Sequence, residues 1–379
     1  MGLPLTASAR ALPQPELAPA TGGGRAALRQ VLREFIGAGP VFVSFSGGRD
    51  SSAVLAVATS VARECGAALP VPVTYRYPGN RDADEDDWQD LVLRHIGLTD
   101  RVVLDITHQQ RLLGRHVQES MATRGLVWPV TVNLQHEMFS LAGGGVLLTG
   151  EGGDELFRGR RSAPIAKLRR TVRRRQRPGG DDVRAVMRAL RPQRRAERDA
   201  QQVADGEAPW LRPGARDRFV ETISSNMTDP LRWDRSVWHG AQRPHTRAVY
   251  HNLDLVAQDY DVQVHHPLLA PEFVSAWMSD GGRLGFTGRT DAMRHLFSDV
   301  LPEPILGRST KAFFDAAHMG PLERGFARRW DGQGIDPEHT DPEVLRATWL
   351  NGDSIGQGDT ALMAAWMASE GLPLEGPPQ

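Results

Sequence analysis

The fold is decided by Val41-Phe42-Val43-Ser44-Phe45-Ser46-Gly47-Gly48-Arg49-Asp50-Ser51-Ser52. Residues 41–45 form an apolar, β-rich run, and a helical pattern follows over 52–65. A strand, a glycine-rich turn and a helix can bind phosphate, because free N–H groups at the helix N-terminus point at its oxygens. An ordinary glycine turn is the alternative. The seven residues 46–52, placed between a strand and a helix, argue against that alternative. The expected nucleotide-binding residues are Ser46, Gly47, Gly48, Asp50, Ser51 and Ser52.

A second string follows another apolar run. Residues 146–149 predict a buried strand, and they lead into Gly150-Glu151-Gly152-Gly153-Asp154-Glu155-Leu156-Phe157. Asp50 and Asp154 then both follow strand ends, where open parallel sheets bind their ligands. Carboxylate oxygens suit Mg²⁺, so we expect these two residues to form a metal site. Asp154 could also cap the following helix, a role that is compatible with metal binding.

The two strings resemble two known motifs. The first is similar to the SGGxDS loop of the PP-loop ATP pyrophosphatases and lacks the lysine of G-x-x-x-x-G-K-[ST]. The second resembles the (S/T)GEGxDE(L/V)F motif in the synthetase domain of asparagine synthetases. The resemblance covers roughly residues 25–330. It implies an enzyme that uses ATP and Mg²⁺ to adenylate a carboxylate, releases pyrophosphate and directs an amine onto the acyl-adenylate.

The resemblance also implies roles for individual residues. Glu151 matches the position of the proposed base, and Gly150 and Asp154 belong to the nucleotide site. Lys311 lies in Arg308-Ser309-Thr310-Lys311-Ala312-Phe313, which is similar to the family's R-x-K-x-x-F, although the lysine comes one residue late. Only Lys167 and Lys311 are lysines among 45 basic residues, so a retained lysine indicates a need for a compact ammonium charge. We therefore expect Lys311 to stabilise the transition state.

The order of patterns predicts the fold class. Strands are expected at 41–45, 71–76, 101–105 and 146–149, and helices at 25–36, 52–65, 84–96, 107–123 and 130–142. Such alternation predicts an α/β protein with a parallel, doubly wound sheet, here of the PP-loop (adenine nucleotide alpha hydrolase-like) type, followed by a mostly helical C-terminal region. The expected segments are a disordered tail 1–24, a nucleotide-binding core 25–157, a basic arm 158–200, a helical region 201–370 and a frayed tail 371–379.

Composition excludes several classes of protein. The net charge of −1 argues against bulk binding to nucleic acid or membranes, and no apolar run is long enough to span a bilayer. The single cysteine, Cys65, rules out a disulfide within the chain and a cysteine-based metal site. A chain with one thiol and no signal peptide is expected in the reducing cytoplasm.

Positive charge is concentrated in one segment. Between Arg158 and Arg198, fifteen arginines and one lysine stand against three acidic residues, a net charge of +13. The segment could be a solvated helical arm that pairs with acidic surface elsewhere, or a docking face for an acidic peptide or partner protein. No aromatic residue lies within it to stack on bases, which argues against nucleic acid as the partner.

The sequence does not identify the source of the amine. Asparagine synthetases carry a glutaminase domain with a cysteine at position 2, where this sequence has Gly2. The amine is therefore expected to be free ammonia, ammonia from a separate glutaminase, or a group already on the substrate. We favour an amide ligase of natural-product metabolism, as in lasso-peptide macrolactam formation. The alternatives are an ammonia-using asparagine synthetase-like subunit, a tRNA-modifying adenylase and a non-catalytic nucleotide-binding partner.

Overall fold

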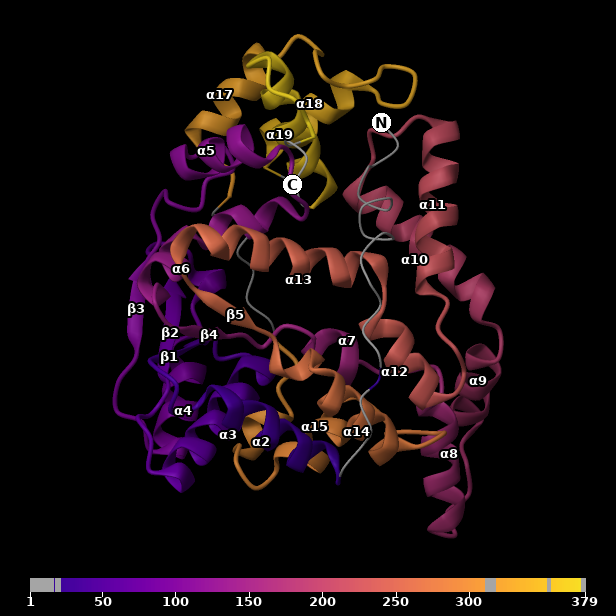
Figure 1. Cartoon of the computed structure of the whole chain (residues 1–379). Helices are drawn as coiled ribbons and strands as arrows, with labels where there is room; N and C mark the ends of the chain where they lie inside the picture. The colour runs from indigo at the N-terminus through magenta and orange to yellow at the C-terminus, as the bar shows by residue number, and fades with distance from the viewer. Residues whose placement is uncertain (1–16, 18–21, 311–317, 353–355, 376–379) are drawn as a thin grey trace.

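The computed structural model describes residues 17, 22–310, 318–352 and 356–375 (Figure 1). Within these residues, five strands form one parallel sheet in the order β3-β2-β1-β4-β5. Their bounds are Val41–Ser44 (β1), Val71–Arg76 (β2), Val102–Asp105 (β3), Val146–Leu148 (β4) and Gln263–His265 (β5).

Helices make up most of the remaining described chain. Those of the first half are α2 (Gly24–Phe35), α3 (Arg49–Cys65), η1 (Arg81–Ala83), α4 (Asp86–Ile96), α5 (Arg115–Arg124), η2 (Val130–Gln135), α6 (His136–Ala142), α7 (Gly153–Phe157), α8 (Ala163–Arg173) and α9 (Gly180–Ala189). Those of the second half are α10 (Pro192–Glu207), α11 (Pro213–Met227), α12 (Trp233–Ala241), α13 (Pro244–Ala257), η3 (Gln258–Tyr260), η4 (Pro267–Leu269), α14 (Pro271–Gly281), α15 (Arg289–Phe297), α16 (Glu303–Leu306), α17 (Pro321–Arg329), α18 (Pro342–Asn351) and α19 (Gln357–Ser369).

The sheet changes winding direction between β1 and β4. The chain passes from β1 through α3 to β2 and through α4 to β3 on one side, whereas β4 pairs with the other side of β1. Val41 lies opposite Val146 in that pair, and Val43 lies opposite Leu148. Open parallel sheets bind ligands where the strand order reverses, outside the carboxyl ends of the strands. The two sequence motifs follow β1 and β4, so both lie at this point.

Apolar side chains cover both faces of the sheet. On one face, Leu28 of α2, Val54 of α3 and Val43 of β1 belong to one buried cluster. On the other, Phe139 of α6, Leu147 of β4 and further residues of α13 form another. A separate core joins α5 to α17, α18 and α19, and Figure 1 shows these helices gathered at one end of the molecule. The predicted parallel α/β sheet with a mostly helical C-terminal region is confirmed.

Several predicted boundaries are wrong. The helix expected over 107–123 begins only at Arg115, because the side-chain oxygen of Gln109 accepts hydrogen bonds from the N–H groups of Thr107 and His108 and favours a turn there. The helix expected over 130–142 begins as the 3₁₀ helix η2 before α6. The mostly helical region also contributes one strand that was not expected, β5, which is three residues long and too short to show a period.

The C-terminal tail is also held more firmly than expected. The N–H of Leu126 donates to the carbonyl of Leu374 at 2.8 Å, and Leu374 packs against the core of α5 and α17–α19. Residues 371–375 are therefore not frayed, whereas 376–379 and most of the N-terminal 1–21 lie outside the described residues.

A membrane-spanning role finds no support in the described chain, where every helix is too short or too polar to cross a bilayer.

Candidate active site

A cavity of about 670 Å³ opens at the carboxyl ends of the central strands. It extends under an apolar and aromatic wall that includes Tyr75, Met138 and Phe139. The expected site residues that line it are Ser46, Gly48, Asp50, Ser51, Gly150, Glu151 and Asp154. The two motifs, about a hundred residues apart in the sequence, thus form one chamber.

The first loop turns sharply into α3. Gly47 has φ +79°, and a Cβ there would lie 2.9 Å from a side-chain carbon of Gln89, so only glycine fits. The hydroxyl of Ser51 accepts from the N–H of Ser46 at 3.3 Å and lies 3.2 Å from the Ser46 hydroxyl. Ser52 differs from expectation: its side chain is fully buried, its hydroxyl has no hydrogen-bond partner, and it does not line the cavity.

Two glycines let the second motif touch the first loop. A Cβ on Gly150 would lie 2.5 Å from the backbone nitrogen of Ser51. A Cβ on Gly153 would lie 2.1 Å from the carboxyl carbon of Asp50. No real side chain tolerates such distances, so the glycines bring the backbone of α7 directly against Asp50.

Arg289 joins the two carboxylates predicted to bind metal. One guanidinium nitrogen donates to Asp50 and another donates to Asp154. Burial raises the pKa of Asp50, and the charge of Arg289 opposes that rise. The second carboxylate oxygen of Asp50, Oδ1, is buried without a hydrogen-bond partner. Two adjacent carboxylates with an unsatisfied oxygen fit a divalent cation.

A second hollow of about 570 Å³ adjoins the first and is strongly basic. The charged residues that line it are Arg49, Arg170, Asp291, Arg289, Arg294 and Arg308. Burial lowers the pKa of Arg49, and the neighbouring charge of Arg289 lowers it further. Four of the five guanidinium groups already pair with carboxylates, those of Arg170, Arg289, Arg294 and Arg308. The lining still favours an anion such as the triphosphate or the pyrophosphate, with Arg49 as the arginine that forms no such ion pair among the described residues.

Arg308 fixes the phosphate loop from a distant part of the chain. It donates to the carbonyl of Gly47 at 3.1 Å and forms an ion pair with Glu85 just before α4. Its guanidinium carbon lies 4.6 Å from the ring centre of Trp88. The side chain is only 3% exposed, so Arg308 serves chiefly to hold the phosphate loop against the start of α4.

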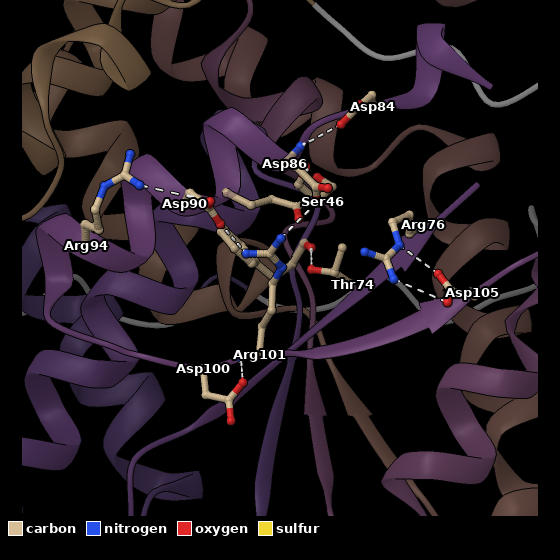
Figure 2. Close-up of polar contacts among 12 residues, drawn as sticks. Ser46, Thr74, Arg76, Asp84, Asp86, Asp90, Arg94, Asp100, Arg101 and Asp105 are labelled. Carbon is tan, nitrogen blue, oxygen red and sulfur yellow. Dashed lines mark hydrogen bonds and ion pairs between the residues drawn. The ribbon is translucent and has the colours of Figure 1, made fainter. Parts of the chain in front are cut away.

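The wall behind the loop is held by a set of polar contacts (Figure 2). Arg101, just before β3, pairs with Asp86 and Asp90 on α4 and anchors that helix to the sheet. From α4, Gln89 donates to the carbonyl of Ser46 at 3.4 Å. On β2, the hydroxyl of Thr74 donates to the carbonyl of Phe45 at 2.6 Å. The loop is thereby supported from both neighbouring elements.

A hydrogen-bond chain orders the backbone at Glu151. Its N–H donates to Thr149 Oγ1 at 3.2 Å, and that oxygen lies 2.7 Å from Nδ1 of His266. Burial lowers the pKa of His266 to about 3, so this imidazole is neutral near pH 7. The Glu151 side chain is exposed at the cavity. Glu155 lines the same cavity, and burial raises its pKa.

Some functional residues escaped the sequence analysis. Arg49 stands at the variable position of the SGGxDS loop, so the motif gave it no role. Glu155 was quoted only as one residue of the motif that begins at Gly150. Arg308 was quoted only as the first residue of the lysine motif, and Arg289 was given no role, because nothing local shows that they reach Gly47 and Asp50. Lys311, the expected catalytic lysine, lies outside the described residues.

Comparison with known proteins agrees with this geometry. The sequence model of the asparagine synthase family matches residues 25–368, nearly the whole chain. A search of curated proteins gives no match. The family, the parallel sheet and the two motifs at its switch point lead to one conclusion: the chain belongs to the asparagine synthase family and is an ATP-dependent ligase of that kind.

Proposed function

We propose that the chain forms an amide by adenylating a substrate carboxylate. A carboxylate oxygen attacks the α-phosphorus of ATP, the bond to the bridging oxygen breaks and pyrophosphate leaves. An amine nitrogen then attacks the acyl carbon, the bond to AMP breaks, and AMP departs with one oxygen of the original carboxylate. The observation that carries this proposal is that Asp50 and Asp154, which follow β1 and β4, share one partner, Arg289, beside a glycine loop without a lysine.

Asp50 and Asp154 would hold Mg²⁺ in this reaction. When bound, the ion neutralises charge on the phosphates and on the leaving pyrophosphate. The chain itself supplies the two carboxylates, the N–H groups at the start of α3 and the arginines of the basic hollow. Lys311 is proposed to stabilise the same negative charge as a compact ammonium group.

The attacking amine must lose a proton, and we propose Glu151 as its acceptor. The side chain faces the cavity from the motif position that carries this role in the family. Glu155 is the second candidate, since a carboxylate with a raised pKa is a better base near neutral pH. Only the second half-reaction needs this proton transfer.

That separation provides the experiment. Glu151→Gln should retain exchange of labelled pyrophosphate into ATP, which reports adenylation, and should lose at least about 100-fold in amide formation. Glu155→Gln is the matched comparison in the same cavity. If Glu151→Gln forms amide at the wild-type rate while Glu155→Gln does not, Glu155 is the base. Loss of pyrophosphate exchange in correctly folded Glu151→Gln would contradict a role confined to the second step.

We further propose that the carboxylate belongs to a peptide and the amine to the same molecule, as in macrolactam formation in the cytoplasm. Residues 264–270 resemble the family's ARVPFLD segment, with His265 in place of the arginine. The ring of His265 stacks on Phe35 at 4.1 Å and does not line the cavity. Recognition of free aspartate would be expected to need a cation there. A peptide with a free N-terminus and an internal Asp or Glu should lose one water on incubation with enzyme and ATP, observed by mass spectrometry. Equal conversion of free aspartate and ammonium to asparagine would overturn this assignment.

A further inference from the structure

Only part of the basic segment is free to meet a partner. Its first three arginines are used within the fold: Arg160 donates to the carbonyl of Ser236 at 3.0 Å, and Arg158 pairs with the buried Asp229. Arg161 donates to the carbonyl of Ala189, the last residue of α9. The contacts of Arg158 and Arg160 anchor the segment to the body of the protein, and that of Arg161 connects the start of the segment to α9. The expectation of one continuous docking face from 158 to 198 is therefore too broad.

The remaining part is the hairpin of α8 and α9, residues 163–191, which we call the arginine hairpin. It lies at the edge of the molecule (Figure 1). Ten basic residues of this hairpin stand against Asp181 and Asp182. Those two carboxylates are already paired, with Arg184 and Lys167 respectively. The hairpin thus keeps a large positive excess on an exposed surface.

Apolar side chains are exposed on the same hairpin. Val183, Met187 and Leu190 follow one another at the i, i+4, i+7 spacing of a single helix face, and each is about half exposed. One residue further along, Arg184, Arg188 and Arg191 repeat the same spacing and are also exposed. Val172 on α8 is 57% exposed. Among the described residues, four of the nine exposed large apolar side chains lie in this hairpin, and none of the four packs into a core cluster.

The hairpin also borders the active site. Arg170 on α8 pairs with Asp291 on α15 at 3.3 Å, and both residues line the basic hollow together with Arg289. A chain bound along the hairpin would therefore have its neighbouring residues close to the nucleotide site.

We propose that the arginine hairpin binds an acidic, amphipathic segment of the same polypeptide whose carboxylate is adenylated. An apolar stripe beside a basic stripe complements a helix with apolar residues on one face and carboxylates next to them. The inference rests on the proposed function for the identity of the ligand, because a peptide substrate would place such a segment beside its reacting carboxylate. Single-stranded nucleic acid fits less well, since the hairpin offers no aromatic platform on which bases could stack and its apolar stripe would stay unpaired.

The binding test uses the full chain without ATP. A fluorescently labelled synthetic peptide of about four helical turns, with leucines on one face and glutamates beside them, is titrated and followed by anisotropy. Arg184→Glu/Arg188→Glu should weaken binding at least tenfold, and Met187→Ala should weaken it several-fold. The matched controls are Arg328→Glu/Arg329→Glu and Leu322→Ala on α17, which are equally exposed and lie at the other end of the molecule. Those controls should bind as the wild type does.

Several results would overturn the proposal: no saturable binding of the peptide, equal weakening by the α17 controls, or tighter binding of a single-stranded RNA of similar length. Because charge reversal could disturb the hairpin, Arg184→Gln/Arg188→Gln provides a milder variant that should also weaken binding. Failure of the proposed function is recognised separately. In that case the peptide binds in the anisotropy assay, yet pyrophosphate exchange stays absent with every peptide and small carboxylate.

Discussion

Arg289 donates a hydrogen bond to Asp50 across 239 residues of sequence. The same guanidinium reaches Asp154, so one positive charge separates two carboxylates that would otherwise repel each other. A divalent cation held by these two carboxylates, as proposed above, would compete with Arg289 for their negative charge. We propose that bound nucleotide and metal draw the guanidinium away from Asp50, toward the basic hollow that it also lines.

Replacement of Arg289 should expose this competition. Arg289→Met is expected to lower the Tm by about 2 °C without Mg²⁺, because two neighbouring carboxylates lose their shared partner. Added Mg²⁺ should raise the Tm of the variant more than that of the wild type, as measured by calorimetry without nucleotide. Arg294→Met on the same helix is the control, since Arg294 pairs with the exposed Glu303. A magnesium response identical in all three proteins would contradict the competition.

The two carboxylates should be needed for the first chemical step. Asp50→Asn and Asp154→Asn should each reduce pyrophosphate release on the order of 100-fold, because the charge that holds Mg²⁺ on the leaving group is halved. Circular dichroism should show an intact fold in both. Near-normal release by either variant would remove that residue from the metal site.

The contact between the two loops can be tested with one methyl group. Gly153→Ala places a Cβ 2.1 Å from the carboxyl carbon of Asp50 and should displace it, with a loss of about 2 kcal/mol in stability and weaker binding of Mg·ATP. Gly159→Ala is the matched control, because no atom lies within 4 Å of its Cβ position. Calorimetry and nucleotide titration should separate the two variants. Equal behaviour would mean that the loops do not meet as described.

The expected role of Lys311 depends on its shape as well as its charge. Lys311→Arg should be nearly as damaging as Lys311→Ala, with a loss of roughly 3 kcal/mol in transition-state stabilisation, since the wider guanidinium replaces a compact ammonium. Lys167→Arg should have no effect on the rate, because Lys167 is exposed and pairs with Asp182 on the surface. Adenylation rates of the three variants decide the matter. Full activity in Lys311→Arg would transfer the role to another cation.

The anchor of the basic segment should respond to acid. Burial alone would raise the pKa of Asp229, but the hydrogen bond with His239 and the charges of Arg158, Arg243 and Arg160 outweigh it and lower the pKa to about 2. The ionised carboxylate therefore stabilises the fold fully above about pH 4, and this contribution is lost as the pH falls toward 2.

Asp229→Asn should consequently cost about 3 kcal/mol near pH 7, because it leaves buried arginines without their partner. The difference from the wild type in the free energy of unfolding should shrink between pH 4 and pH 2 in urea titrations. A difference that stays constant over this window would show that Asp229 is not held ionised by the cluster.

The sequence predicted those parts of the site that are local. The loop after β1 and the motif after β4 are continuous strings, and their glycines indicate directly where the backbone turns sharply. The parallel sheet follows from the alternation of strand and helix patterns. Arg289 and Arg308 could not be assigned in this way, because their partners lie 239 and 261 residues away. The burial of Ser52 was missed for a related reason, since the motif does not show which of two adjacent serines faces the cavity.

Transfer of oxygen tests the central claim most directly. The purified chain is incubated with ATP, Mg²⁺ and a peptide whose carboxylates carry ¹⁸O, and the nucleotide products are analysed by mass spectrometry and ³¹P NMR. Adenylation followed by amide formation predicts AMP that carries one ¹⁸O atom, together with unlabelled pyrophosphate. Formation of ADP and labelled phosphate would contradict the account, because the carboxylate would then have attacked the γ-phosphorus.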